Sequence, residues 1–391
     1  MQGVFEMKKM IKIVLSFTLL FSWFIPIAHA EELVESGISA VLMEVETGRI
    51  LYEKNPHEQL EPASMTKMMP MYLILEAIAD GRLDWEQEVT VSEYAAGLGG
   101  TQIYLEPGET MTIRDLFASV AIASANDAIT ALGEMLSGSE EAFVELMNER
   151  AHEFGMLNTM FKNSTGLPAD GHVTTAYDMA ILAQRLIMDH PEVTEFTSLY
   201  EDYVREDSED PFWLVNTNKL VRYVEGVDGL KTGSTDAAGY CLAATAKRGN
   251  MRVVAVVMGA ERSELRNREV ARLIEYAFSQ YELHPRLETG SVVGTHHYVL
   301  AEGRKFDVVT TSPLSLLVGV RQHLGEEHQE VILNREITVP IEPGDIVGRL
   351  VYYIDGEIYQ EIDLTVSETV ERTPFIALWM HLLGHLFFGG H

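Results

Sequence analysis

The sequence predicts an α+β protein in which one antiparallel sheet takes strands from both ends of a domain. Two strand-like runs surround Thr47-Gly48 within residues 38–55, which is a hairpin signal. A stretch rich in helix formers covers residues 110–190, and β-rich runs return after it. Blocks of strands, helices, strands and a closing helix in this order are typical of the α+β class.

The first 30 residues have the pattern of an export signal. Lys8, Lys9 and Lys12 give a basic start, the apolar run IVLSFTLLFSWFIPIA follows, and AHA at 28–30 is a small-x-small cleavage site. We therefore expect a signal peptide over residues 1–30 and an exported protein. The alternative is an uncleaved membrane anchor.

Composition limits the kinds of partner that the protein could bind and indicates how its fold is stabilised. The formal net charge is −30 over 391 residues, so a nucleic-acid partner is not expected. Cys241 is the single cysteine, which excludes an internal disulfide. The hydrophobic fraction of 47% is ample for a core that needs no covalent staples.

The elements of residues 31–283 can be expected in the following order. A helix begins near EPASMTKMMPMYLILEAI at 61–78, and apolar residues recur at helical spacing over 116–136. GLKTGST, GYCLAATAKR and MRVVAVVMGA then predict an antiparallel meander. EVARLIEYAFSQY at 269–281 predicts a closing helix.

A second, all-β domain is expected over residues 284–370. Apolar and polar residues alternate there, and Asp355-Gly356 between LVYYI and EIYQEIDL is a strong hairpin signal. No group of residues typical of a catalytic site is apparent in this part. A stalk that lifts the first domain from the membrane is the simpler interpretation of it, and docking of a partner is the alternative.

Residues 373–391 predict an amphipathic helix. Phe375, Trp379, Leu382 and other apolar residues repeat at helical spacing, but the stretch is too short to span a bilayer comfortably. It suits a helix that lies in the membrane interface, and packing on the protein's own surface is the alternative. His381 and His385 have i, i+4 spacing without an evident third ligand, so no metal site is expected.

Three short motifs could carry chemistry. Ser64 and Lys67 are three residues apart and share one face of a helix, where a neutral lysine could take the proton of the serine. Ser124 and Asn126 form an S-x-N motif between helical runs, and Lys231, Thr232 and Gly233 form a K-T-G motif on a strand. Each motif alone has a structural explanation, such as a helix cap or a turn. In this order they match the set known from penicillin-binding proteins and class A β-lactamases.

With these motifs the chain resembles the low-molecular-weight penicillin-binding proteins, which are serine-type D-alanyl-D-alanine carboxypeptidases of the peptidase S11 family. The matching stretches cover most of residues 38–280, and they read VETGRILYEKN, PASMTKMM, GGTQIYLEPGE, ASANDAITAL, KNSTGLPADGHVTTAYDMA and GVDGLKTGSTDAAGYCLAATAK. The resemblance implies a penicillin-binding/β-lactamase-like antiparallel sheet with helices, followed by the small β domain and the amphipathic tail.

The resemblance also implies an activity, a substrate and partners. The protein would remove the terminal D-alanine from peptidoglycan pentapeptide stems, would be acylated by β-lactam antibiotics, and would need no metal or other cofactor. It would lie at the outer face of the cell membrane, held by its C-terminal helix and in part secreted.

Residue roles follow from the same resemblance. Ser64 would be the nucleophile, Lys67 its general base and Ser124 a proton relay to the leaving group. The backbone N–H groups of Ser64 and Ser234 would form the oxyanion hole. The residues that bind the substrate would be Asn126, Lys231, Thr232, Gly233 and Ser234. Arg266 stands where some relatives place a basic residue near the substrate.

Several rivals can be weighed against this interpretation. A class A β-lactamase needs a glutamate in an E-x-x-L-N segment, and EFGMLN at 153–158 has one residue too many. A zinc peptidase would need a second histidine where HEFGM has Met156. An endopeptidase, a transpeptidase or a non-catalytic protein that binds the wall or β-lactams would have the same motifs, so these alternatives stay open.

Overall fold

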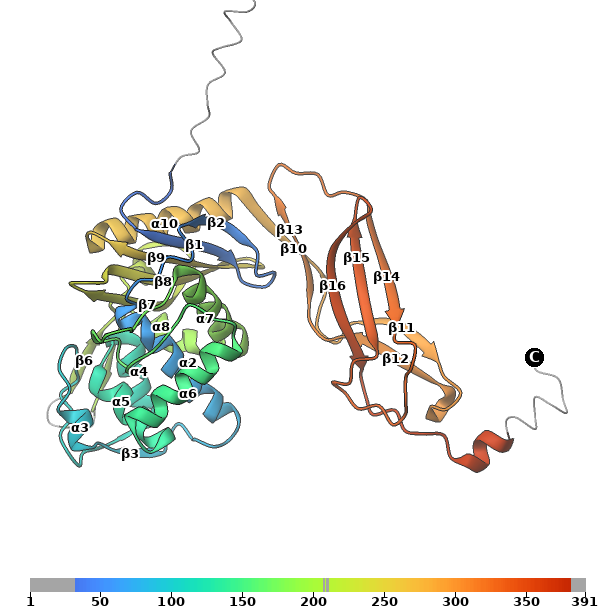
Figure 1. The fold of residues 1–391 in the computed structure, drawn as a ribbon, viewed down its shortest axis with the longest axis horizontal. Helices are drawn as coiled ribbons and strands as arrows, with labels where there is room; N and C mark the ends of the chain where they lie inside the picture. The colour runs from blue at the N-terminus through green and yellow to red at the C-terminus, as the bar shows by residue number, and fades with distance from the viewer. Residues whose placement is uncertain (1–31, 207, 209–210, 381–391) are drawn as a thin grey trace, which may run out of the picture.

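The computed structural model describes residues 32–206, 208 and 211–380, which form two bodies joined end to end (Figure 1). The first body contains a five-stranded antiparallel sheet with the strand order β2-β1-β9-β8-β7. These strands are β1 (Ser39–Glu44), β2 (Ile50–Lys54), β7 (Val227–Thr235), β8 (Gly239–Arg248) and β9 (Met251–Ala260). The N-terminal hairpin therefore joins the later meander through β1 and β9, as the sequence predicted.

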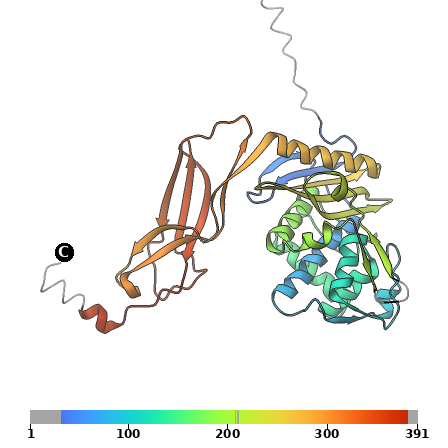
Figure 2. The same ribbon diagram turned by 180° about the vertical axis from the view of Figure 1, so that it is seen from behind.

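Helices cover both faces of this sheet (Figure 2). Helix α10 (Ser263–Gln280) packs on one face, where Leu273 and Ile274 meet Leu42 and Leu242 in one apolar cluster. The other face carries a larger helical layer that contains Met69, Phe117 and most of the buried side chains. Alternate residues of the central strands point into the two layers, so both faces of these strands are apolar.

The helical layer is built from short segments around α2 (Met68–Ala79), whose first eight residues are all buried. A helix with neighbours on every side is apolar all round, which explains the run MMPMYLIL. The other segments are η1 (Ala63–Lys67), α3 (Glu93–Ala96), α4 (Ile113–Ala118), η2 (Ser119–Ala123), α5 (Asn126–Ser137), α6 (Glu140–Glu153), α7 (Ala176–Asp189), α8 (Val193–Thr197) and α9 (Leu220–Tyr223).

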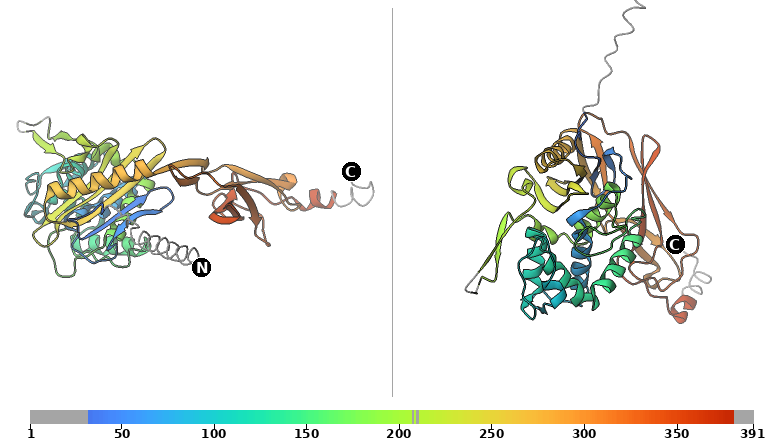
Figure 3. Two further views of the ribbon diagram at one scale, coloured as in Figure 1. Left: turned by 90° about the horizontal axis from the view of Figure 1, so that it is seen from above. Right: turned by 60° about the vertical axis from the view of Figure 1, so that its left-hand side comes forward.

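Two small hairpins complete this body. Strand β3 (Glu88–Thr90) pairs with β4 (Thr110–Thr112), and β5 (Glu201–Val204) pairs with β6 (Phe212–Val215). The β5–β6 hairpin projects from the body (Figure 3). Because β6 continues directly into residues 216–218, the chain returns from this hairpin to the edge of the main sheet.

The second body is all-β and has its own apolar core, which includes Phe306, Leu316 and Leu350. Strand β10 (Tyr281–Leu287) follows α10 and pairs with β13 (Leu314–Gly319). A five-stranded sheet has the order β11-β12-β16-β15-β14. Its strands are β11 (Val292–His297), β12 (Lys305–Thr310), β14 (Glu327–Leu333), β15 (Gly348–Ile354) and β16 (Glu357–Val366), and η3 (Glu302–Arg304) precedes β12. The predicted Asp355-Gly356 turn joins β15 to β16.

Some predicted boundaries differ from the structure, and some lie outside it. The closing helix α10 begins at Ser263, six residues before the predicted 269, because residues 263–268 are polar apart from Leu265 and carry no apolar pattern. Residues 375–380 are helical and expose Phe375 and Trp379, whereas the rest of the predicted tail helix lies outside the described residues. The predicted signal peptide also lies outside them. No helix within the described residues is long and apolar enough to cross a membrane.

Candidate active site

The S-x-x-K motif forms the centre of the candidate site. Ser64 and Lys67 lie in the 3₁₀ turn η1, directly before α2, and the lysine side chain is fully buried. Lys67 Nζ lies 3.1 Å from Ser64 Oγ. It also donates to Asn126 Oδ1 at 2.7 Å and to the carbonyl oxygen of Thr165 at 2.6 Å. The structure thus brings the first two motifs into direct contact.

Two glycines let other segments approach this turn closely. A Cβ atom on Gly233 would lie 2.8 Å from the Pro62 carbonyl oxygen and 3.1 Å from the Met65 nitrogen. A Cβ atom on Gly166, whose φ is +82°, would lie 1.9 Å from the Ala63 carbonyl oxygen. Real Cβ atoms are not found at such distances, so both positions require glycine for packing against η1.

The S-x-N motif lies at the junction of two helices. The π-helical turn η2 ends at Ala123, the following Ser124 has left-handed φ and ψ of 70° and 32°, and α5 begins at Asn126. π-Helical turns occur frequently at functional sites. Asn126 is held at three points, because its Nδ2 donates to the Gly99 carbonyl, its backbone N–H donates to the Thr101 carbonyl, and its Oδ1 accepts from Lys67. The Ser124 hydroxyl makes no hydrogen bond with another described residue.

The K-T-G motif lies on β7, the strand at the edge of the main sheet. This strand packs against η1, and Gly233 lies directly against the turn that carries Ser64. Because side chains alternate along a strand, Lys231 lies on the same side of β7 as Gly233, and Thr232 lies on the other side. The Lys231 side chain is fully buried, and the Thr232 hydroxyl donates to the Thr217 hydroxyl at 2.7 Å. Ser234 follows as an exposed residue on the same strand. All of the residues named from the motifs therefore lie on three neighbouring segments.

Burial and like charges shift the pKa values of the two lysines in the same direction. Burial, reinforced by Lys231, lowers the pKa of Lys67 well below its ordinary value. Burial, reinforced by Arg266, lowers the pKa of Lys231 to about 7. Arg266 is itself buried behind β8 and donates to the Cys241 carbonyl at 3.2 Å. Its effect on the site is therefore electrostatic and passes through Lys231.

Cys241 lies on the strand next to the motif and takes no part in it. The thiol is fully buried, and burial raises its pKa to about 11. A thiol held in its neutral form is a poor nucleophile. Cys241 is therefore a buried residue of the core that is not set up to react.

Sequence reasoning missed several residues that hold the site in shape. Asp127, fully buried, accepts hydrogen bonds from the backbone N–H groups of Ile103 and Leu105 and so fixes the loop beside Asn126. Glu140 accepts from the N–H and the hydroxyl of Ser164, next to the carbonyl that binds Lys67. Asp127 directly follows the S-x-N motif and could have been noticed, whereas Glu140 has no signal in the sequence.

Within residues 32–206, 208 and 211–380, no group of three or more histidine, cysteine or acidic side chains is arranged to hold a metal ion. The polar side chains of the site are the hydroxyls of Ser64, Ser124 and Thr232, two amines of lowered pKa and the amide of Asn126. This set is suited to nucleophilic attack by the hydroxyl with an amine as the base.

Comparison with known proteins gives the same result over nearly the whole chain. Residues 27–262 match the D-alanyl-D-alanine carboxypeptidase family, and residues 281–372 match the C-terminal domain of penicillin-binding protein 5. The D-alanyl-D-alanine carboxypeptidase DacF of Bacillus subtilis is 44% identical over 91% of each chain. The carboxypeptidase DacC of Escherichia coli is 32% identical over 90% of each chain.

Solved structures share the fold. Penicillin-binding protein 5 of Haemophilus influenzae superimposes with a TM-score of 0.72 at 29% identity, covering 86% of this chain and 98% of its own. Penicillin-binding protein D2 of Listeria monocytogenes, in its ampicillin-bound form, gives a TM-score of 0.56 at 36% identity over 62% of this chain and 98% of its own. Together with the site, these matches show that the chain belongs to the family of serine-type D-alanyl-D-alanine carboxypeptidases.

Proposed function

We propose that this enzyme removes the terminal D-alanine from peptidoglycan stems through an acyl-enzyme on Ser64. The observation that supports this most directly is the triple contact of Lys67 Nζ. A neutral amine has two N–H donors and one lone pair. The two shorter contacts, to Asn126 and Thr165, use the donors, so the lone pair is left for the Ser64 hydroxyl at 3.1 Å.

The acylation step then follows from this geometry. Lys67 takes the Ser64 proton while Oγ attacks the carbonyl carbon of the penultimate D-alanine. The N–H groups of Ser64 and Ser234 would bind the resulting oxyanion, and removal of one such donor in another serine enzyme costs about 2.7–4 kcal/mol. When the intermediate collapses, the C–N bond breaks and the leaving D-alanine takes a proton through Ser124. Water then hydrolyses the ester and frees Ser64.

The remaining residues bind the substrate. Lys231 and Thr232 would hold the terminal carboxylate, and Asn126 would bind the peptide amide. A buried cationic site in a protein of net charge −30 has a clear purpose if the ligand is an anion. β-Lactams carry a carboxylate as well and would acylate the same serine.

A β-lactamase on the same scaffold is less well supported. Glu153, the glutamate of the EFGMLN segment, pairs with Arg150 at 2.8 Å on the surface of α6, and its side chain is 65% exposed. The Glu153 carboxylate is therefore bound to Arg150 and is not among the groups described above that contact Ser64. A non-catalytic wall-binding protein would not need two lysines of lowered pKa.

For the whole chain we propose a signal peptide over residues 1–30, a catalytic domain over 31–283, a β domain over 284–370 that acts as a stalk, and a peripheral membrane anchor over 373–391. The exposed Phe375, Ile376, Trp379 and Met380 support the anchor. Such an enzyme would work at the outer face of the cell membrane. Truncation after residue 372 should abolish binding to vesicles, and equal binding by both forms would contradict the anchor.

The activity can be tested on residues 31–372 with diacetyl-Lys-D-Ala-D-Ala as the substrate. Release of D-alanine by the wild type but not by Ser64→Ala would support both the reaction and the nucleophile. Covalent labelling by penicillin without any release of D-alanine would refute the carboxypeptidase and favour a sensor.

A further inference from the structure

The η1 turn is held from behind by a buried histidine, His172. A 3₁₀ helix has three residues per turn, so Ser64 and Lys67 share one side of η1, whereas Thr66 points to another side. Thr66 and His172 are both buried, and Thr66 Oγ1 lies 2.9 Å from His172 Nε2. The contact therefore fixes the turn that carries the proposed nucleophile and its base without touching either of them.

The second ring nitrogen decides which way this hydrogen bond runs. The backbone N–H of Lys162 donates to His172 Nδ1 at 3.3 Å, so this nitrogen carries a lone pair. Burial lowers the pKa of His172 to about 4, so the ring is neutral near pH 7. The single ring proton is therefore on Nε2, which donates to the Thr66 hydroxyl. The Phe161 ring meets the imidazole edge-on, with centroids 5.9 Å apart, and limits its rotation.

His172 also ends the loop that supplies a carbonyl to Lys67. A backbone bridge closes this loop, residues 162–172, at its base. Within the loop, the Thr165 carbonyl accepts from Lys67 Nζ at 2.6 Å. The loop thus meets η1 at two places on different sides of the turn, through Thr165 at Lys67 and through His172 at Thr66.

From this geometry we propose that His172 is a positioning residue for the acylation of Ser64. The proposal rests on the proposed function, in which Lys67 takes the Ser64 proton. The lone pair of Lys67 is left for Ser64 only while both N–H groups of the neutral amine are bound, and one of them donates to the Thr165 carbonyl. His172 locks the turn to the loop and so keeps this carbonyl within reach of Lys67.

Two replacements of similar polarity separate the two contacts of His172. In His172→Gln an amide N–H takes the place of Nε2–H and keeps the bond to Thr66, whereas the shorter side chain of His172→Asn accepts from Lys162 but does not reach Thr66. Labelling by increasing concentrations of a fluorescent penicillin gives the dissociation constant of the first complex and the acylation rate constant. We expect His172→Asn to lower the rate constant about tenfold with the dissociation constant unchanged, and His172→Gln to stay within about threefold of the wild type.

The other partner of the hydrogen bond provides a second set of variants, which keeps the test valid if a histidine variant does not fold. Thr66→Val has nearly the shape of threonine but cannot accept a hydrogen bond, so it should also slow acylation about tenfold, whereas Thr66→Ser should keep the wild-type rate. Thr66→Val combined with His172→Asn should be no slower than either variant alone, because both remove the same contact.

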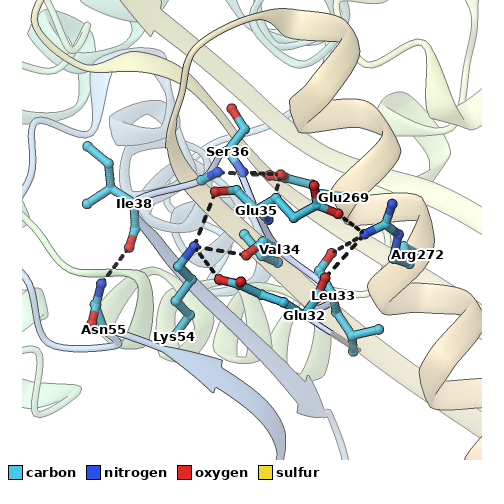
Figure 4. Close-up of polar contacts among 11 residues, drawn as sticks. Glu32, Leu33, Val34, Glu35, Ser36, Ile38, Lys54, Asn55, Glu269 and Arg272 are labelled. Atoms are coloured by element: carbon cyan, nitrogen blue, oxygen red, sulfur yellow. Dashed lines mark hydrogen bonds and ion pairs between the residues drawn. The ribbon is translucent and has the colours of Figure 1, made fainter. Parts of the chain in front are cut away.

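Glu269→Gln is the matched control for a loss of stability alone. Glu269 lies on α10, and the faces of the sheet covered by α10 and by η1 are opposite. Its buried carboxylate accepts from the N–H groups of Glu35 and Gly37 at 2.9 and 3.0 Å (Figure 4). The variant should lower the free energy of unfolding but keep the wild-type rate of acylation.

Several outcomes would overturn this role of His172. They are wild-type acylation by His172→Asn, a change confined to the dissociation constant, an equal loss in His172→Gln and His172→Asn, and slow acylation by Glu269→Gln. A folded wild type that is not labelled by penicillin and releases no D-alanine would instead refute the proposed function itself.

Discussion

Replacement of Glu140 by alanine should damage the active site from a distance, because Glu140 holds the loop that holds Lys67. Its carboxylate accepts from the Ser164 N–H at 2.7 Å and from the Ser164 hydroxyl at 2.9 Å. The next residue, Thr165, gives its carbonyl to Lys67 Nζ at 2.6 Å. Loss of the carboxylate leaves the buried Ser164 N–H without an acceptor and leaves the Ser164 hydroxyl with only Thr130 Oγ1, at 3.5 Å.

The size of the effect can be worked out from these contacts. A hydrogen bond to a charged group contributes about 1.5–3 kcal/mol, so the two contribute about 3–6 kcal/mol. Burial raises the pKa of Glu140, which shows that desolvation of the carboxylate offsets part of this gain. We therefore expect a net loss of about 2–4 kcal/mol in local stability. A looser Thr165 carbonyl should also lower the rate of acylation at least tenfold, which corresponds to about 1.4 kcal/mol.

Glu141→Ala provides the matched control. Glu141 lies in the same first turn of α6 and carries the same charge, but it is exposed. Hydrogen exchange at the Ser164 amide reports the local stability, and the second-order rate of labelling by a fluorescent penicillin reports the acylation. If Glu140→Ala exchanges and reacts like Glu141→Ala, then Glu140 does not position the base and the reasoning fails.

Three further predictions concern the titration and geometry of the site. Thr217→Val should raise KM for peptides with a free terminal carboxylate about three- to tenfold, because the Thr232 hydroxyl loses the acceptor to which it donates. Thr217→Ser should restore KM. A change confined to kcat would contradict this role of Thr217. The pKa of Lys231 lies at about 7, so its cation is lost as pH rises and KM should increase above pH 7. Burial lowers the pKa of Lys67, so the acylation rate should fall as pH is lowered and this lysine becomes protonated. A flat KM in steady-state kinetics from pH 5 to 9 would contradict the role of Lys231. Burial lowers the pKa of His172 to about 4, so the folded state favours the neutral imidazole. The free energy of unfolding should be at its full value above the unfolded pKa of about 6.5 and should decrease by up to about 3 kcal/mol as pH falls toward 4. His172→Asn should flatten this dependence of the unfolding free energy on pH in denaturant titrations, and an unchanged dependence would assign the acid sensitivity to other groups.

Much of the fold could be predicted because local patterns and long-range packing agree. The hairpin of residues 38–55, the meander of β7 to β9 and the Asp355-Gly356 turn are each specified by alternation and turn residues within a few positions. The start of α10 was misjudged because residues 263–268 are polar apart from Leu265, and the contact of Arg266 with the sheet leaves no apolar signal in the sequence. The length of a helix depends on the segments that pack against it as much as on its own sequence.

The sequence by itself determined the chemistry of this protein. Ser64, Lys67, Ser124, Asn126 and the K-T-G residues are short-range motifs, and their order along the chain was sufficient to indicate the family and the reaction. Residue type and local spacing carry this information because Ser64, the proposed nucleophile, and Lys67, its proposed base, lie on one turn.

Only the tertiary structure decided how these residues are activated. The lowered pKa values of Lys67 and Lys231 come from burial and from charges far away in sequence, among them Arg266. The contacts of Glu140 and Thr217 likewise depend on segments that meet only when the chain folds. Electrostatic energies depend on distance and on the surrounding dielectric, and neither quantity is fixed until the segments have packed together.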